Sequence, residues 1–165
     1  MLEIWPWTSE LVLEALRAGY ADDIVDGVTF YINPLQRFVS NELWDLIQER
    51  EWPIVAIRTV GGGDVHQLRD SGKAPAYIQK RAAQVAPLYE ASGCQSWVEF
   101  CMRFAFGIPQ LRATIGATGR VENLREYIAA AQNSTPLRAD IQQAVLDLQT
   151  AWYLEYDRFA EPWSM

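Results

Sequence analysis

Apolar and polar residues form two different patterns along this chain, one typical of helices and one typical of buried strands. Apolar residues that recur every three or four positions predict amphipathic helices, whereas short continuous apolar runs rich in β-branched residues predict buried strands. The helical spacing is present at 9–18, 41–50, 75–91, 95–106, 120–132 and 137–160. The strand-like runs are at 26–32, 53–57 and 111–115.

The order of these segments predicts an α/β fold. Strands alternate with helices, and the connections are short apart from the polar segment 58–75. Such alternation is typical of parallel strands joined by right-handed crossovers. A chain of 165 residues is long enough for one hydrophobic core and short for two, so we expect residues 1–165 to form a single domain.

The amino-acid composition indicates a folded chain and argues against some classes of binding partner. Half of the residues are hydrophobic and seven are Trp, which predicts a folded chain. The formal net charge is −7 and the fourteen Lys and Arg residues form no run, so nucleic acid and anionic membrane surfaces are not expected partners. The chain has no apolar stretch of transmembrane length, and its start, MLEIWPW, lacks the features of a signal peptide; a cytoplasmic protein is therefore expected.

The two cysteines are predicted to be free. Cys94 and Cys101 are seven positions apart on a predicted helix, which separates them by roughly 10 Å along its axis. That separation is too large for a disulfide, so both are expected to be buried thiols. The sequence also has no Cys/His cluster with metal-ligand spacing, and no metal is expected.

Candidate chemistry lies in two glycine-rich turns that follow strands, at 61–63 and 116–119. In parallel α/β folds ligands bind at the carboxyl ends of strands, and the free N–H groups at a helix N-terminus attract phosphate. Arg58, Lys73 and Arg120 could add positive charge. Each feature also has a purely structural explanation, because glycine ends strands for steric reasons and surface cations are usually solvated. The residues alone therefore indicate a phosphate-ligand site on a partial parallel barrel.

Three segments resemble the C-terminal half of the aldo/keto reductases, NADP(H)-dependent oxidoreductases built on a (β/α)8 barrel. VDGVTFYINPL at 25–35 is similar to the sixth strand of that family, and AIRTVGGG at 56–63 is similar to the seventh. LRATIGATGRVENLREYIAAA at 111–131 resembles the eighth strand and the helix that holds the adenosine phosphate. The resemblance implies a partial (β/α)8 TIM barrel, with roughly the last four β/α units and a C-terminal helix.

The resemblance also implies NADP(H) as the cofactor. Asn123 matches a polar contact to adenine, and the turn before it resembles the cradle for the 2′-phosphate. The residues that the resemblance assigns to cofactor binding are Arg58, Gly61, Gly62, Gly116, Ala117, Thr118, Gly119, Arg120 and Asn123.

This chain departs from the family pattern mainly at the nicotinamide. Thr29 stands where the family has a Gln that bonds the nicotinamide amide, and Ile57 stands where a Tyr stacks on the ring. Arg58 replaces the usual Ser, and Tyr127 replaces an Asn of the adenosine helix. A basic residue is usual in the family within 117–119, and Arg120 lies one step away. The resemblance therefore implies that the phosphate cradle is preserved in shape and that the contacts to the nicotinamide are weakened.

The catalytic Asp, Tyr, Lys and His of the family come from its first four strands, and this chain resembles the family only from about the fifth. No catalytic residue is assigned, and the isolated chain is expected to be inactive. Half a barrel would leave unpaired strand edges, so we expect self-association or a complementary N-terminal half, with a small carbonyl substrate for the complete barrel. The alternative is a non-catalytic interaction or regulatory protein derived from a reductase.

Overall fold

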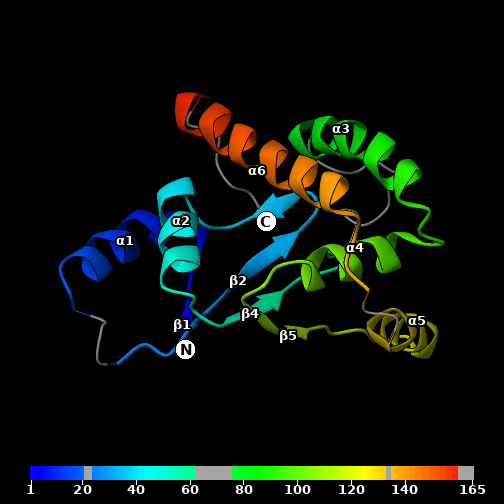
Figure 1. Ribbon diagram of the computed structural model, residues 1–165, viewed down its shortest axis with the longest axis horizontal. Coiled ribbons are helices and arrows are strands. Elements are labelled where there is room, and N and C mark those ends of the chain that lie inside the picture. Colours follow the sequence, from blue (N-terminus) through cyan, green and yellow to red (C-terminus); the bar gives the residue numbers. More distant parts are fainter. Residues whose placement is uncertain (21–23, 62–75, 133–134, 160–165) are drawn as a thin grey trace.

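Four parallel strands form the centre of the molecule (Figure 1). The structure, a computed structural model, describes residues 1–20, 24–61, 76–132 and 135–159. In these residues the parallel strands lie in the order β1-β2-β4-β5, and the short strand β3 pairs with β2 in the antiparallel direction. The strands are β1 (Leu2–Glu3), β2 (Val28–Asn33), β3 (Gln36–Arg37), β4 (Ile54–Ile57) and β5 (Leu111–Ile115).

The helices alternate with these strands along the chain, as the spacing of apolar residues predicts. Each of the six predicted helices and three predicted strands is confirmed, with ends that differ by at most two residues. The helices are α1 (Ser9–Arg17), α2 (Asn41–Glu49), α3 (Ala76–Ser92), α4 (Trp97–Phe106), α5 (Val121–Gln132) and α6 (Ala139–Phe159), and the 3-10 helix η1 (Pro6–Thr8) precedes α1.

Strands β1 and β3 are not predicted by the apolar pattern, and each is two residues long. A segment that short has no periodicity to detect. β1 is nevertheless important for the architecture, because it pairs in parallel with β2 through Leu2 opposite Val28 and Glu3 opposite Thr29. It supplies the fourth parallel strand, which confirms the expected fold of a partial (β/α)8 barrel.

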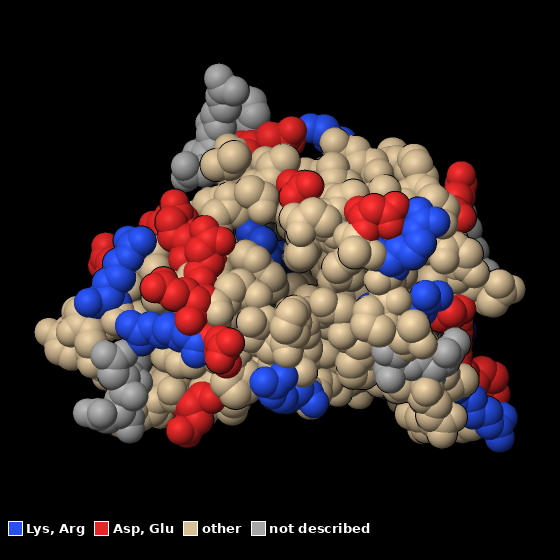
Figure 2. All heavy atoms as spheres, in the orientation of Figure 1, with Lys and Arg blue, Asp and Glu red and all other residues tan. Residues whose placement is uncertain are grey.

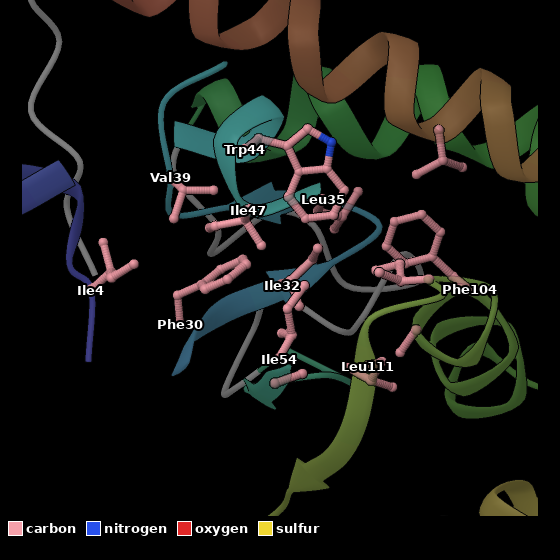
Figure 3. Packing of buried hydrophobic residues seen from close by; sticks show 14 of the residues in the cluster. Ile4, Phe30, Ile32, Leu35, Val39, Trp44, Ile47, Ile54, Phe104 and Leu111 are labelled. Atoms are coloured by element: carbon pink, nitrogen blue, oxygen red, sulfur yellow. The ribbon is translucent and has the colours of Figure 1, made fainter. Parts of the chain in front are cut away.

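The two faces of the sheet differ in burial, and this difference determines where the core lies. In β2, Val28, Phe30 and Ile32 have no exposed surface, whereas Thr29 and Tyr31 between them are half-buried. The buried set points toward the helices, because successive residues of a strand face opposite sides. Figure 3 shows Phe30 and Ile32 beneath α2, and the rings of Phe30 and Trp44 meet edge to face at 6.4 Å between centroids.

Helix α6 forms side-chain hydrogen bonds to two segments that are distant from it in the sequence. The Gln149 side chain donates a hydrogen bond to the carbonyl of Asn33 at 2.8 Å, and the Gln142 side chain donates one to the carbonyl of Phe104 at 3.0 Å. Both glutamines are buried, so these bonds replace water for backbone carbonyls at the end of β2 and near the end of α4. The helix runs beside α3 across one side of the molecule (Figure 1).

The prediction for the cysteines is right about their oxidation state and partly wrong about their positions. Both thiols are free. Cys94 lies before α4, whose N-cap is Ser96, and it is half-buried; only Cys101 is on the helix and fully buried. Burial raises the pKa of the Cys101 thiol well above its ordinary value, so Cys101 is protonated at neutral pH.

None of the described helices is both long enough and apolar enough to span a bilayer.

We predict that Leu43→Ala lowers the free energy of unfolding by about 2–5 kcal/mol, because it leaves a cavity in the core. Leu43, on α2, has no exposed surface. The matched control is Leu154→Ala on α6, where the side chain is 60% exposed and the same change should stay within about 0.5 kcal/mol. Urea unfolding followed by circular dichroism measures both, and equal losses would contradict the burial described above.

Candidate functional site

The predicted site residues follow strands whose carboxyl ends lie at one edge of the sheet. Tyr31 of β2 lies opposite Ile57 of β4, and Ile57 lies opposite Ile115 of β5. Because all three strands are parallel, the turns that follow them emerge at the same edge. Arg58 and Gly116, the next residues of β4 and β5, are therefore neighbours there.

The turn after β4 has an unusual backbone. Arg58 has a φ of 52° and Gly61 has a φ of 77°, both in the left-handed region. Glycine adopts this region freely, whereas arginine does so only under constraint. Two hydrogen bonds supply that constraint: the Gly61 N–H donates to the Arg58 carbonyl at 2.8 Å, and the Asn33 side-chain amide donates to the same carbonyl at 3.1 Å.

The side chain of Arg58 lies against an aromatic cluster that sequence reasoning missed. Its guanidinium carbon is 4.9 Å from the centre of the Tyr31 ring. Tyr31 in turn packs on Trp5, at 5.2 Å between ring centroids, and on Phe38 at 4.6 Å. The alternation of β2 could have placed Tyr31 on the face opposite the core, but nothing in the sequence brings Trp5 and Phe38 beside it.

The turn between β5 and α5 is exposed along its whole length, from Gly116 to Arg120. The Thr118 hydroxyl accepts a hydrogen bond from the Arg120 N–H at 3.2 Å, and the Arg120 carbonyl accepts the N–H of Leu124 at the same distance. Helix α5 begins at Val121, so the N–H groups of its first turn point toward this segment without partners inside the helix. This positive end of the helix dipole suits an anion.

The two glycines of this turn have different roles. A Cβ placed on Gly116 would lie 3.0 Å from the Tyr127 ring, so the close approach of that ring explains a glycine there. Tyr127 is held in place because its hydroxyl shares a hydrogen bond with that of Thr114. A Cβ on Gly119 would meet nothing within 4 Å. The space beside Gly119 is therefore open.

Two arginines at this edge of the sheet form no ion pair with an acidic residue in the described part of the chain. Arg120 is exposed, and its guanidinium has no ion pair or hydrogen bond with any residue that the structure describes. Arg58 is half-buried and forms no ion pair within the described ranges. Asn123, on the first turn of α5, is exposed as well. Unpaired cations beside a helix N-terminus can bind a phosphate through charge-assisted hydrogen bonds.

The positions that depart from the family pattern lie on the face of the sheet opposite the core. Thr29 and Ile57 are both half-buried there. The Thr29 hydroxyl donates a hydrogen bond to the carbonyl of Val55 at 2.8 Å, so its proton is engaged within the sheet. Ile57 offers only an aliphatic surface. Neither side chain can reproduce the amide contact or the ring stacking that the resemblance assigns to these positions.

The structure thus places the predicted residues in two adjacent groups. Arg58 and Gly61 follow β4, whereas the second group, in the β5–α5 turn and the start of α5, comprises Gly116, Ala117, Thr118, Gly119, Arg120 and Asn123. Gly62, Gly63 and Lys73 lie outside the described residues. Among the residues that the structure does describe, no group of three His, Cys, Asp or Glu could hold a metal ion.

Comparison with known proteins identifies the fold. The chain superposes on the aldo-keto reductase AKR11C1 from Bacillus halodurans with a TM-score of 0.62 in both its apo and holo forms, at 18% sequence identity. The match covers 85% of this chain but only 47% and 46% of those two structures, so the chain spans just under half of their length. No protein-family model and no curated protein sequence matches the chain.

We predict that Gly116→Ala lowers the free energy of unfolding by about 1 kcal/mol or more, because the new methyl group crowds the Tyr127 ring. Gly119→Ala should be neutral or slightly stabilising, since its methyl group meets open space and reduces the entropy of the unfolded chain. Thermal unfolding measures both variants. In a Tyr127→Ala background Gly116→Ala should no longer destabilise; a persistent loss there would rule out the ring as its cause.

Proposed function

We propose that this chain binds the phosphate-bearing end of NADP(H) at the β5–α5 turn and represents one half of an NADP(H)-dependent oxidoreductase barrel. The observation that carries the proposal is the turn itself. It follows a parallel strand, leads into the N-terminus of a 12-residue helix, and ends in Arg120, whose guanidinium has no partner among the residues that the structure describes. Its likeness in fold to half of an aldo-keto reductase adds support.

The residues of the turn fit a phosphate group. Gly119 faces open space, and the first-turn N–H groups of α5 are free to donate hydrogen bonds. We assign the 2′-phosphate to Arg120 with Thr118, and the adenine to Asn123. Arg58 and Gly61 complete the proposed site, because they follow the neighbouring strand at the same edge of the sheet. Gly62, which lies outside the described residues, is included only on the family resemblance.

The nicotinamide end does not fit in the same way. Thr29 is bonded to the sheet and Ile57 has no polar or aromatic group, so the described residues offer no recognisable hold on the nicotinamide. When bound, NADPH supplies a hydride; no residue described in this chain is assigned a part in its transfer. Reduction of a small carbonyl compound is proposed only for a barrel completed by a second half that contributes an acid to protonate the carbonyl oxygen.

A second candidate function is a non-catalytic interaction or regulatory protein. The same two residues, Thr29 and Ile57, favour it, because they remove the contacts to the reactive ring while the fold is kept. Under this alternative the turn at 116–120 has no ligand and the open sheet edges bind protein. The two functions differ in whether NADP(H) binds at all.

We also propose a cytosolic location. Both cysteines are free thiols, and Cys94 is partly accessible. Free thiols persist in the reducing environment of the cytosol.

We predict that Arg120→Ala weakens NADPH binding by about 10- to 100-fold, because a charge-assisted hydrogen bond to a phosphate contributes about 1.5–3 kcal/mol. NADH lacks the 2′-phosphate, so its affinity should change much less. The matched control is Arg112→Ala on β5, whose guanidinium already donates to the carbonyl of Pro109 at 2.8 Å. Isothermal titration calorimetry with each cofactor measures the difference.

Each outcome of that titration has a meaning. Equal losses for NADPH and NADH would remove the proposed role of Arg120 in binding the 2′-phosphate. A wild-type chain that binds neither cofactor at millimolar concentration would overturn the proposed function and support the interaction protein instead.

A further inference from the structure

Large apolar side chains are exposed at two places, and those places are the two open ends of the sheet. Nine large hydrophobic residues within the described ranges are exposed, and eight of them lie on or beside β1 with α1, or on or beside β5 with α5. We call the first group the β1-side patch, consisting of Met1, Leu11, Tyr20 and Ile24. The second is the β5-side patch, consisting of Ile115, Val121, Leu124 and Ile128.

The β5-side patch combines an exposed apolar face of helix α5 with Ile115 at the end of strand β5. Val121, Leu124 and Ile128 recur at helical spacing on α5 and are 56%, 48% and 47% exposed. Apolar residues at that spacing normally face a core, yet on α5 these three are exposed and Ala130 is the buried residue of the helix. Strand β5 beside it pairs with β4 on one side, and no described strand pairs with its other side.

The β1-side patch lies at the opposite end of the sheet, as Figure 1 shows for α1 and α5. Leu11 on α1 is 67% exposed, and Tyr20 and Ile24 beyond the helix are 78% and 75% exposed. Strand β1 pairs with β2 on its inner side, and its outer side has no partner among the described strands. Both ends thus combine an unpaired parallel edge with exposed apolar side chains, a combination that favours association.

We propose that the β5-side patch of one copy packs against the β1-side patch of a second copy, and that two such contacts close a ring. The number of strands supports a second copy of the chain as the binding partner. Each copy contributes the four parallel strands found in its described residues, so two copies supply eight, which is the number that closes a (β/α)8 barrel. In such a ring β5 runs beside β1 of the other copy in the parallel direction, and every strand has two neighbours.

Charge complements this arrangement. From the start of β1 to the end of α1 the charged residues are three acids and one base, namely Glu3, Glu10, Glu14 and Arg17. From β5 to the end of α5 they are three bases and two acids, namely Arg112, Arg120, Arg125, Glu122 and Glu126. Figure 2 shows many acidic side chains, with some Lys and Arg between them, on the side of the molecule where α1 and α2 lie. A head-to-tail contact brings surfaces of opposite net charge together, whereas a contact of the α1 sides with each other would repel.

Closure also explains the half-buried face of the sheet. Thr29, Tyr31, Val55 and Ile57 lie on the face opposite the core and are only partly covered in one copy. In a ring of eight strands this face becomes the interior of the barrel, which is filled by side chains. The proposal does not require the cofactor to bind. Of the residues assigned to NADP(H) it uses only Arg120, as one of the charges counted between β5 and the end of α5.

The first test is the mass in solution of the 165-residue chain, by sedimentation equilibrium over a dilution series. We expect a dimer of the 18.8 kDa chain. Leu11→Lys and Ile128→Lys should each raise the dimer dissociation constant at least about tenfold, because a lysine then faces an apolar surface. Leu154→Lys is the matched control, since Leu154 is 60% exposed and lies on α6, outside both patches.

The second test distinguishes head-to-tail contact from contact of like surfaces. A mixed dimer of Leu11→Lys with Ile128→Lys has one contact with both lysines and one contact without either. Mixing the two variants should therefore produce more dimer than either variant forms alone at the same total concentration. All three variants replace exposed side chains and should remain folded, which circular dichroism checks.

Several results would overturn the proposal. A wild-type chain that stays monomeric at every concentration excludes the ring. A Leu11→Lys variant that dimerises like the wild type, beside a monomeric Ile128→Lys, indicates contact of two β5-side patches instead. An equal loss with Leu154→Lys places the contact elsewhere on the surface. Because none of these results involves NADP(H), they are independent of the outcome of the cofactor titration.

Discussion

Parallel pairing of β2 with a strand on each side is the constraint on which the rest of this structure depends. Parallel strands cannot be joined by tight hairpins, so each connection carries a helix back across the sheet. One face of the sheet is then covered, and Phe30 and Ile32 are buried beneath it. The same constraint brings the carboxyl ends of β2, β4 and β5 to one edge, where the candidate site lies.

At that edge the backbone is held in a conformation that it would not adopt alone. Arg58 has a left-handed φ, and its carbonyl accepts hydrogen bonds from both Asn33 and Gly61. Since Asn33 ends β2 and Arg58 follows β4, the bond ties two neighbouring strands together beyond their last paired residues. The strained turn also directs the guanidinium of Arg58 onto the Tyr31 ring. Rigid placement of a cation is an arrangement suited to binding, where an ordered side chain loses less entropy.

The sequence predicts the regular elements well because their signals are local. Caps, apolar spacing and β-branched runs all act within one helix or strand, and Ser40 does cap α2 by accepting the N–H of Leu43. The strands β1 and β3 could not be predicted, because two residues form a strand only when a partner is already beside them. The Trp5, Tyr31 and Phe38 cluster escaped for the same reason, as it joins residues from separate segments. At the candidate site the glycines were found by pattern, but only the structure separates Gly116, which accommodates a ring, from Gly119, which faces open space.

The hydrogen bonds of α6 have a consequence for the order in which the molecule is assembled. Gln149 bonds a carbonyl 116 positions earlier in the chain, at the end of β2. Contacts between residues so distant in sequence form late, because a long loop must close before they contribute. During synthesis on the ribosome, β2 and β4 can pair long before residue 149 emerges. The carbonyl of Asn33 must then remain solvated or be bound by something else, so the end of β2 lacks its partner from α6 until long after the last described strand, β5, has been made.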